Sequence, residues 1–187
     1  MSVITLLSTR TADPTLVDIL HAPLAVTFGA RIHSAACDID LEDVFDPGRV
    51  QYNSSSLIVL LRDTVCAHAV ADGKVLAVVS RDLFVPILTY VFGEAELGGT
   101  IAVISYHRLQ NQLYGLPPDP ALLASRLRKE AIHELGHTFG LLHCPLQSCV
   151  MHTSTTVEDI DLKEEQLCHG CRREYLTRQP SPPAIHL

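Results

Sequence analysis

An eleven-residue motif, H-E-x-x-H-x-x-G-x-x-H, constrains this chain more than any other feature. Its first two histidines, His133 and His137, share one face of a helix and can hold one zinc ion. Glu134 lies beside them, where its carboxylate can reach a water on the metal. Gly140 can adopt the positive φ that ends a helix, and this turn can return His143 as a third ligand. Three protein ligands leave a fourth position for water, which is typical of catalytic zinc.

Four of the 6 cysteines follow this motif and form a second candidate metal site. Cys144 and Cys149 form a C-x-x-x-x-C pair, and Cys168 and Cys171 form a C-x-x-C pair. Two short-spaced pairs joined by a longer loop are typical of structural zinc, because four thiolates leave no open position. This zinc would attach the C-terminal segment to the motif helix and fix His143, which Cys144 follows directly. Two disulfides are the alternative, which a reducing compartment disfavours.

The composition excludes several other classes of protein. The chain has 187 residues, which suits one compact domain, and 47% of them are hydrophobic, which excludes global disorder. A net charge of -7 argues against a nucleic-acid binder. The apolar N-terminus is too short for a signal peptide, and no run reaches membrane-spanning length. We expect a soluble, cytoplasmic protein with reduced thiols, preferably a monomer, and we expect Cys37 and Cys66 to be buried apolar residues.

The hydrophobic pattern predicts an α/β fold. Strands are expected at residues 1–8, 25–30, 74–79 and 100–105, and helices at 14–20, 54–69 and 121–140. The apolar run 74–79 indicates a buried central strand with helices on both faces and parallel neighbours. Residues 100–105 are expected at the sheet edge, where a peptide could pair. Arg126, Arg128 and Lys129 are expected on the solvated face of the motif helix.

The string from His133 to Cys171 resembles the archaemetzincin signature: the metzincin histidine motif, an adjacent Cys, then C-x-M and C-x-x-C. Residues 82–84 and 92–95 also look like segments of this family. The resemblance implies a metzincin-like fold, in which a twisted mixed sheet with a backing helix and an active-site helix is followed by a small C-terminal lobe. It also implies two zinc ions, one catalytic on the three histidines and one structural on the four cysteines. Met151 would occupy the Met-turn and form the apolar floor beneath the zinc histidines.

One position departs from better-known metzincins, some of which place a tyrosine shortly after the Met-turn methionine. Here Met151 is followed by His152, Thr153 and Ser154. The group that stabilises the oxyanion beside the zinc is therefore open. His152 is one candidate, and an exposed loop histidine with no such role is the alternative.

We expect a single metalloprotease catalytic domain over residues 1–187, with an upper lobe of about 1–140, a zinc-attached lower lobe of about 141–178 and a loose tail at 179–187. The expected activity is zinc-dependent hydrolysis of peptide or protein substrates, with Glu134 as general base. One alternative is a zinc-stabilised binding or regulatory protein with little or no catalysis. Another is a deformylase-like hydrolase, whose third ligand would be an upstream cysteine. The sequence does not select endopeptidase over aminopeptidase action.

Overall fold

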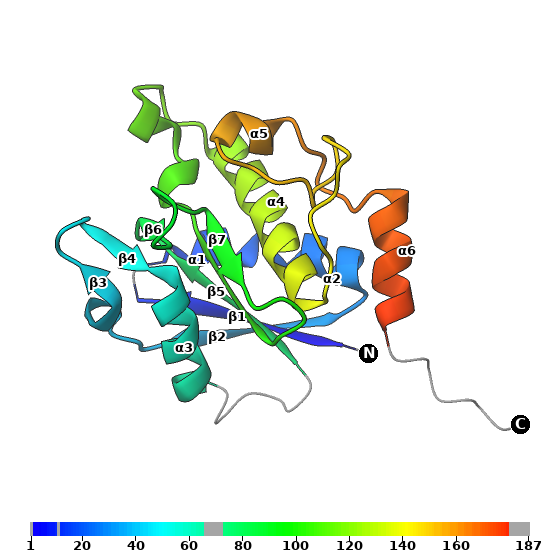
Figure 1. The fold of residues 1–187 in the computed structure, drawn as a ribbon, viewed down its shortest axis with the longest axis horizontal. Helices are drawn as coiled ribbons and strands as arrows, with labels where there is room; N and C mark the ends of the chain where they lie inside the picture. The colour runs from blue at the N-terminus through cyan, green and yellow to red at the C-terminus, as the bar shows by residue number, and fades with distance from the viewer. Residues whose placement is uncertain (1, 11, 66–72, 180–187) are drawn as a thin grey trace, which may run out of the picture.

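The computed structural model describes residues 2–10, 12–65 and 73–179, and its main element is a mixed five-stranded sheet. The strands lie in the order β2-β1-β5-β8-β7 (Figure 1). Their bounds are β1 (Val3–Thr9), β2 (Arg31–Cys37), β5 (Lys74–Val79), β7 (Gly93–Ala95) and β8 (Ile101–Ser105). All neighbours are parallel except β7, which runs antiparallel to β8. A small second sheet contains β3 (Phe45–Asp46), β4 (Gln51–Asn53) and β6 (Leu83–Phe84).

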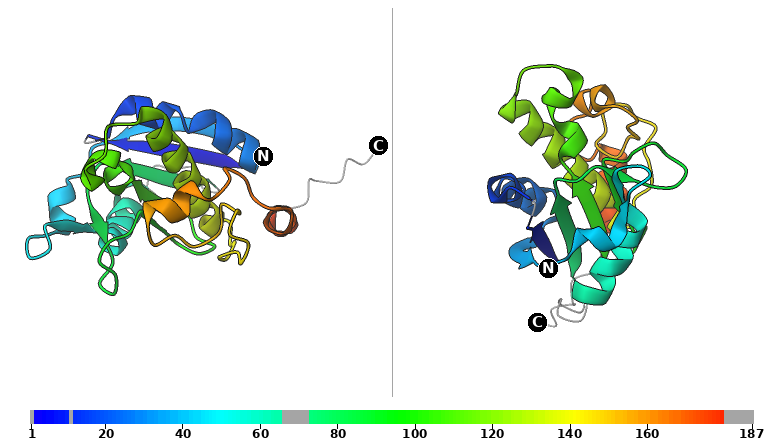
Figure 2. Two further views of the ribbon diagram at one scale, coloured as in Figure 1. Left: turned by 90° about the horizontal axis from the view of Figure 1, so that it is seen from above. Right: turned by 90° about the vertical axis from the view of Figure 1, so that its left-hand side faces the viewer.

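Helices cover both faces of the main sheet, as the sequence predicts (Figure 2). They are α1 (Pro14–Asp18), α2 (His21–Phe28), α3 (Ser54–Val65), α4 (Pro120–Thr138), α5 (Val157–Asp161) and α6 (His169–Arg178), with the 3-10 turns η1 (Leu41–Val44), η2 (His107–Leu109) and η3 (Asn111–Tyr114). Successive strand residues point to opposite faces. Val75, Ala77 and Val79 therefore join the core under α3, whereas Leu76 and Val78 join the core under α2 and α4. The central buried strand at 74–79 is confirmed.

The predicted strand at residues 25–30 is wrong, because most of this segment belongs to helix α2. Leu24 and Phe28 are four residues apart and both are buried, whereas Val26 is 76% exposed. This spacing has the period of a helix packed on one side. Gly29 then adopts the left-handed conformation, with a φ of 56°, which ends the helix and turns the chain into β2.

The predicted edge strand is also wrong in its position. Residues 101–105 form β8, but β7 pairs along its outer side and is itself the edge of the sheet. Both β7 and β8 contact α4, so the edge strand lies beside the motif helix (Figure 1). The last four residues of the expected helix 54–69, which include Cys66, lie outside the described residues, as do residues 180–187 of the expected tail.

Two of the three basic residues expected on a solvated face of α4 are buried instead. Arg126 is 4% exposed and bonds Asp161 through two guanidinium nitrogens, at 2.7 and 2.6 Å. Lys129 is 6% exposed and donates to the carbonyl oxygens of Ile160 and Asp161. These side chains attach α5 to α4. Only Arg128 is partly exposed, and it pairs with the Glu165 carboxylate.

An aromatic cluster holds α6 against the rest of the chain. Phe28, Phe139 and Tyr175 lie with ring centroids 5.0 to 5.4 Å apart. The Tyr175 hydroxyl donates to the Phe28 carbonyl oxygen at 2.6 Å. The C-terminal segment is therefore anchored by aromatic packing and by this hydrogen bond. Within the described ranges, no helix has the length and apolarity needed to cross a membrane.

Candidate active site and metal centres

Helix α4 presents the first two histidines of the motif, and the chain turns back to add the third. Asp119 caps the start of the helix by accepting from the Leu122 backbone N–H. After the helix ends, Gly140 has a φ of 87° and the chain reverses. The candidate ligand atoms of His133, His137 and His143 all lie within 4.8 Å of one another. The structure therefore brings together the three predicted ligands.

The donor atoms of this trio suit a zinc ion. Nδ1 of His133 lies 2.8 Å from the Val150 carbonyl oxygen, and Nδ1 of His137 lies 2.8 Å from that of Leu141. A carbonyl oxygen only accepts, so each Nδ1 carries the proton and each Nε2 presents a free lone pair. The two Nε2 atoms are 3.1 Å apart, and tetrahedral zinc holds nitrogen ligands about 3.3 Å apart. Burial lowers the pKa of both imidazoles and keeps them neutral, as ligation requires.

Glu134 is the buried carboxylate of the site. It is 6% exposed and lines a cavity of about 360 Å³ together with His133 and His143. Burial raises the pKa of Glu134 well above its usual range, and the neighbouring carboxylates of Glu130 and Glu94 raise it further. A carboxylate in such surroundings is a stronger proton acceptor than one in water.

The residue at the Met-turn position lies directly against the motif helix. Met151 is fully buried, and its thioether contacts the helix at Gly136, where a Cβ would lie 3.0 Å from the Met151 Cε. Glycine inside the motif thus allows close packing of the methionine. His152 directs Nδ1 to the Cys144 carbonyl oxygen at 2.7 Å. Its part in oxyanion stabilisation stays a prediction.

The four cysteines form a second cluster, whose sulfur atoms all lie within 4.8 Å of one another. Sγ of Cys144 lies 3.8 Å from that of Cys168, and Sγ of Cys149 lies 3.8 Å from that of Cys171. Tetrahedral zinc with Zn–S bonds of about 2.3 Å also places its sulfurs about 3.8 Å apart. A backbone hydrogen bond from Cys171 lowers the pKa of Cys168 to about 7, which favours the thiolate there, whereas burial raises the pKa of Cys149 and Cys171. All cysteines in the described ranges are free thiols, so the disulfide alternative finds no support.

Sequence reasoning missed three polar residues of the same cavity. Glu130, Ser154 and Lys163 line it beside Glu134. Glu130 precedes Glu134 by one helical turn, and this spacing is a signal that places both carboxylates on one face of α4. Lys163 follows α5 and carries no comparable signal, because only tertiary packing brings it to α4.

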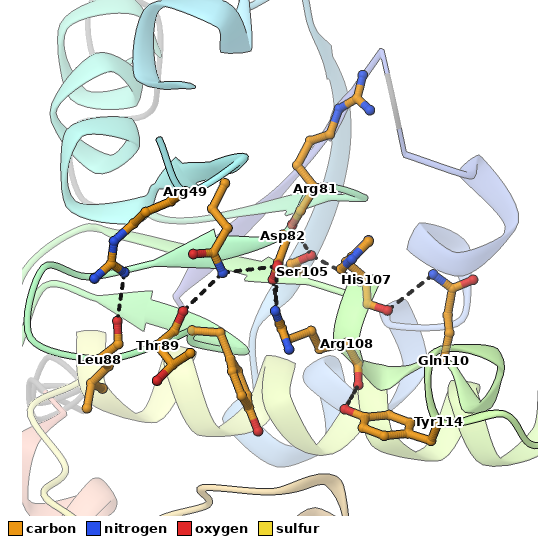
Figure 3. A network of polar contacts seen from close by, with 12 residues as sticks. Arg49, Arg81, Asp82, Leu88, Thr89, Ser105, His107, Arg108, Gln110 and Tyr114 are labelled. Atoms are coloured by element: carbon orange, nitrogen blue, oxygen red, sulfur yellow. Dashed lines mark hydrogen bonds and ion pairs between the residues drawn. The ribbon is translucent and has the colours of Figure 1, made fainter. Parts of the chain in front are cut away.

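A polar network centred on Asp82 supports the cavity wall formed by residues 88–93 (Figure 3). Arg108 binds both carboxylate oxygens of Asp82 at 2.6 Å. The Gln51 side-chain amide donates to Asp82 and to a backbone carbonyl of the wall, each at 3.0 Å. The Arg108 guanidinium also stacks on the Tyr90 ring, 4.1 Å from its centroid. These contacts therefore support the wall on the side that faces away from the cavity. Residues 82–84, which look like a family segment, include Asp82 at the centre of this network.

The site contains three imidazoles that converge on one point next to a buried carboxylate. Two of them and the carboxylate lie on the long helix that packs against a mixed sheet. This arrangement is typical of metal-dependent hydrolases. Residues 42–177 match peptidase family M54. The chain is 41% identical over 160 residues to the archaemetzincin of Haloarcula marismortui, covering 84% of this chain and 82% of the relative. The crystal structure of archaemetzincin from Methanopyrus kandleri is similar with a TM-score of 0.81 at 31% identity, covering 95% of this chain and 94% of that one. A zinc-dependent peptidase from Methanocorpusculum labreanum is similar with a TM-score of 0.81 at 29% identity, over 92% and 99% of the two chains.

The chain therefore belongs to peptidase family M54, the archaemetzincin family of zinc metallopeptidases. The matched residues include both candidate metal centres and the cavity that Glu134 lines. The expected metzincin-like α/β fold is confirmed by the structural similarity.

Proposed function

We propose that this protein hydrolyses peptide bonds at a zinc ion held by His133, His137 and His143, with Glu134 as the general base. The observation that carries the proposal is the shared cavity, which Glu134 lines together with two of the three histidines. Zinc in such a site polarises the scissile carbonyl and lowers the pKa of its water toward neutrality.

Each protein group has a defined task in this proposal. The backbone carbonyls that accept from the Nδ1 atoms of His133 and His137 fix the imidazole orientations. The Glu134 carboxylate accepts a proton from the attacking water and returns it to the leaving amine, for which its raised pKa is suited. An extended substrate would pair with β7, since this strand rather than β8 is the free edge next to α4.

We further propose a second, structural zinc on Cys144, Cys149, Cys168 and Cys171. The backbone N–H of Cys144 donates to the Met151 carbonyl oxygen at 2.9 Å, so this site would also hold the Met-turn in place. In this proposal, residues 1–187 form one catalytic domain, with the upper lobe ending near Gly140 and the lower lobe near residue 178. Reduced cysteine ligands suit a cytoplasmic location.

A peptide library tests the activity. Zinc-loaded wild-type protein is expected to cleave peptides, and a chelator should abolish cleavage. Glu134→Ala should keep the zinc and lose turnover, whereas Glu174→Ala, at a half-exposed position on α6, should retain it. Turnover by the Glu134→Ala variant would rule out the general base. A wild-type protein that binds peptides without cleaving them would instead be a binding or regulatory protein. Peptides with free and acetylated N-termini distinguish aminopeptidase from endopeptidase action.

A further inference from the structure

Three buried side-chain atoms in the described residues lack any hydrogen-bond partner, and all belong to the cavity beside Glu134. They are Oε1 of Glu130, Oγ of Ser154 and Nζ of Lys163. Buried polar atoms are nearly always paired in folded proteins, because an unpaired one loses its hydration without compensation. Their concentration in one cavity indicates a site that a polar ligand completes.

The three atoms have complementary hydrogen-bonding capacities. Lys163 Nζ lies 3.8 Å from Glu130 Oε1, which is close enough for attraction but too long for a hydrogen bond. The two side chains are 0% and 4% exposed, so their opposite charges face each other inside the protein. The ammonium group only donates, the carboxylate only accepts, and the hydroxyl of Ser154 does both.

The surrounding structure fixes the positions of the elements that carry these groups. Arg126 and Lys129 tie α5 to α4 and thereby place Lys163, whose backbone N–H donates to Ile160. Across the cavity, the Tyr90 hydroxyl donates to the Thr155 carbonyl oxygen at 2.8 Å. This bond joins the wall of residues 88–93 to the loop that carries Ser154. The polar groups are therefore preorganised for a ligand.

We propose that this cavity is the specificity pocket of the peptidase site and takes a primary amide side chain, glutamine or asparagine, from the substrate residue next to the scissile bond. This inference rests on the proposed peptidase function. The amide oxygen accepts from Lys163 Nζ, and the amide nitrogen donates to Glu130 Oε1. Ser154 Oγ supplies a further hydrogen bond, so that one neutral group satisfies all three atoms.

Other side chains fit these groups less well. A substrate carboxylate would pair with Lys163 but would place a second negative charge beside Glu130. A substrate ammonium or guanidinium would pair with Glu130 but would be repelled by Lys163. Either would bring a further charge into a buried site and would be repelled by one member of the pair. An apolar side chain would leave all three polar atoms unpaired and remove any water that reaches them.

Ligand binding tests the pocket assignment, and the peptide cleavage assay described above tests the function on which it rests. Four peptide hydroxamates that differ in one side chain, glutamine, glutamate, lysine or leucine, are titrated calorimetrically into the zinc-loaded protein. We expect the glutamine ligand to bind about tenfold or more tightly than each of the others. In the Lys163→Met variant, the affinity for the glutamine ligand should exceed that for the leucine ligand by no more than about threefold. Arg173→Met, an exposed change on α6, should preserve the preference for glutamine.

Each result decides between outcomes. Equal affinities, or preference for glutamate, lysine or leucine, would overturn the proposal and leave peptidase activity standing. Preferred binding of glutamine without cleavage of any peptide would overturn the peptidase function and leave the pocket assignment standing. If Lys163→Met does not fold, Ser154→Ala and Glu130→Gln replace it. A glutamine advantage unchanged in both of these would also contradict the proposal.

Discussion

Gly93 on the edge strand lies against the carboxylate side chain of Glu134. A Cβ at this position would be 2.7 Å from Glu134 Cγ and 2.9 Å from its Oε1, and 2.8 Å from the carbonyl oxygen of Val103. No side chain larger than hydrogen fits there without moving the carboxylate or the strand. The edge strand and the general base of the proposed mechanism are therefore positioned by one close contact.

Gly93→Ala should impair catalysis without removing zinc. The added methyl group displaces the Glu134 carboxylate, and a displacement near 1 Å lowers turnover by roughly 10- to 100-fold. Peptide cleavage rates and zinc content on the same preparation check this. Glu174→Ala is the control, since this half-exposed side chain on α6 lies in neither proposed zinc site. Full activity of Gly93→Ala would show that Glu134 is not held by this contact.

The two proposed zinc ions should be separable by mutation. His137→Ala should lower zinc from two ions per chain to one with little change in stability. Cys168→Ser should remove the other ion and lower the melting temperature by roughly 10 °C or more, because a structural zinc site stabilises the fold. Elemental analysis and thermal unfolding measure both effects. A wild-type content of one ion per chain would contradict the two-site proposal.

Arg126→Met should destabilise the protein by about 2–3 kcal/mol, because it leaves Asp161 and the Leu109 carbonyl oxygen without their buried donor. Arg178→Met breaks an ion pair whose side chains are 46% and 44% exposed, and should cost less than about 1 kcal/mol. Urea unfolding of both variants gives the comparison. An equal loss of unfolding free energy in the two variants would mean that burial does not increase the contribution of the Arg126 ion pair to stability.

Tyr175 should make stability fall at high pH. Burial raises the pKa of Tyr175 to about 12, whereas an unfolded tyrosine titrates near 10. Between these values the unfolded chain releases the proton and the folded chain keeps it. The stability that the protonated Tyr175 hydroxyl contributes is therefore fully present below pH 10 and is lost as the pH rises to 12. It amounts to about 2–3 kcal/mol.

Urea unfolding of wild type and Tyr175→Phe at pH 9 to 12 measures this loss. The stability advantage of the wild type over the variant should shrink as the pH rises. A constant difference across this range would show that Tyr175 titrates alike in both states.

Local patterns predicted the parts of the site that lie close together in sequence. The histidine trio and the cysteine cluster came from short spacings, and the apolar run of β5 marked the sheet centre. Long-range contacts were the source of the errors. Residues 25–30 resemble a strand by composition, but one-sided packing of Leu24 and Phe28 makes them helical. Arg126 is a charged residue of the type usually found at the surface, and its burial is explained by acceptors outside its own helix, on Asp161, Leu109 and Asn111.

The sequence by itself determined which side chains can bind metal, because helix geometry and short loops leave few ways to place neighbouring residues. Only the tertiary structure decided that β7 forms the sheet edge and that Gly93 packs on Glu134. It also decided that Lys163 faces Glu130. These contacts join segments that are far apart in the chain, and they form only when α4, α5 and the sheet pack closely against one another.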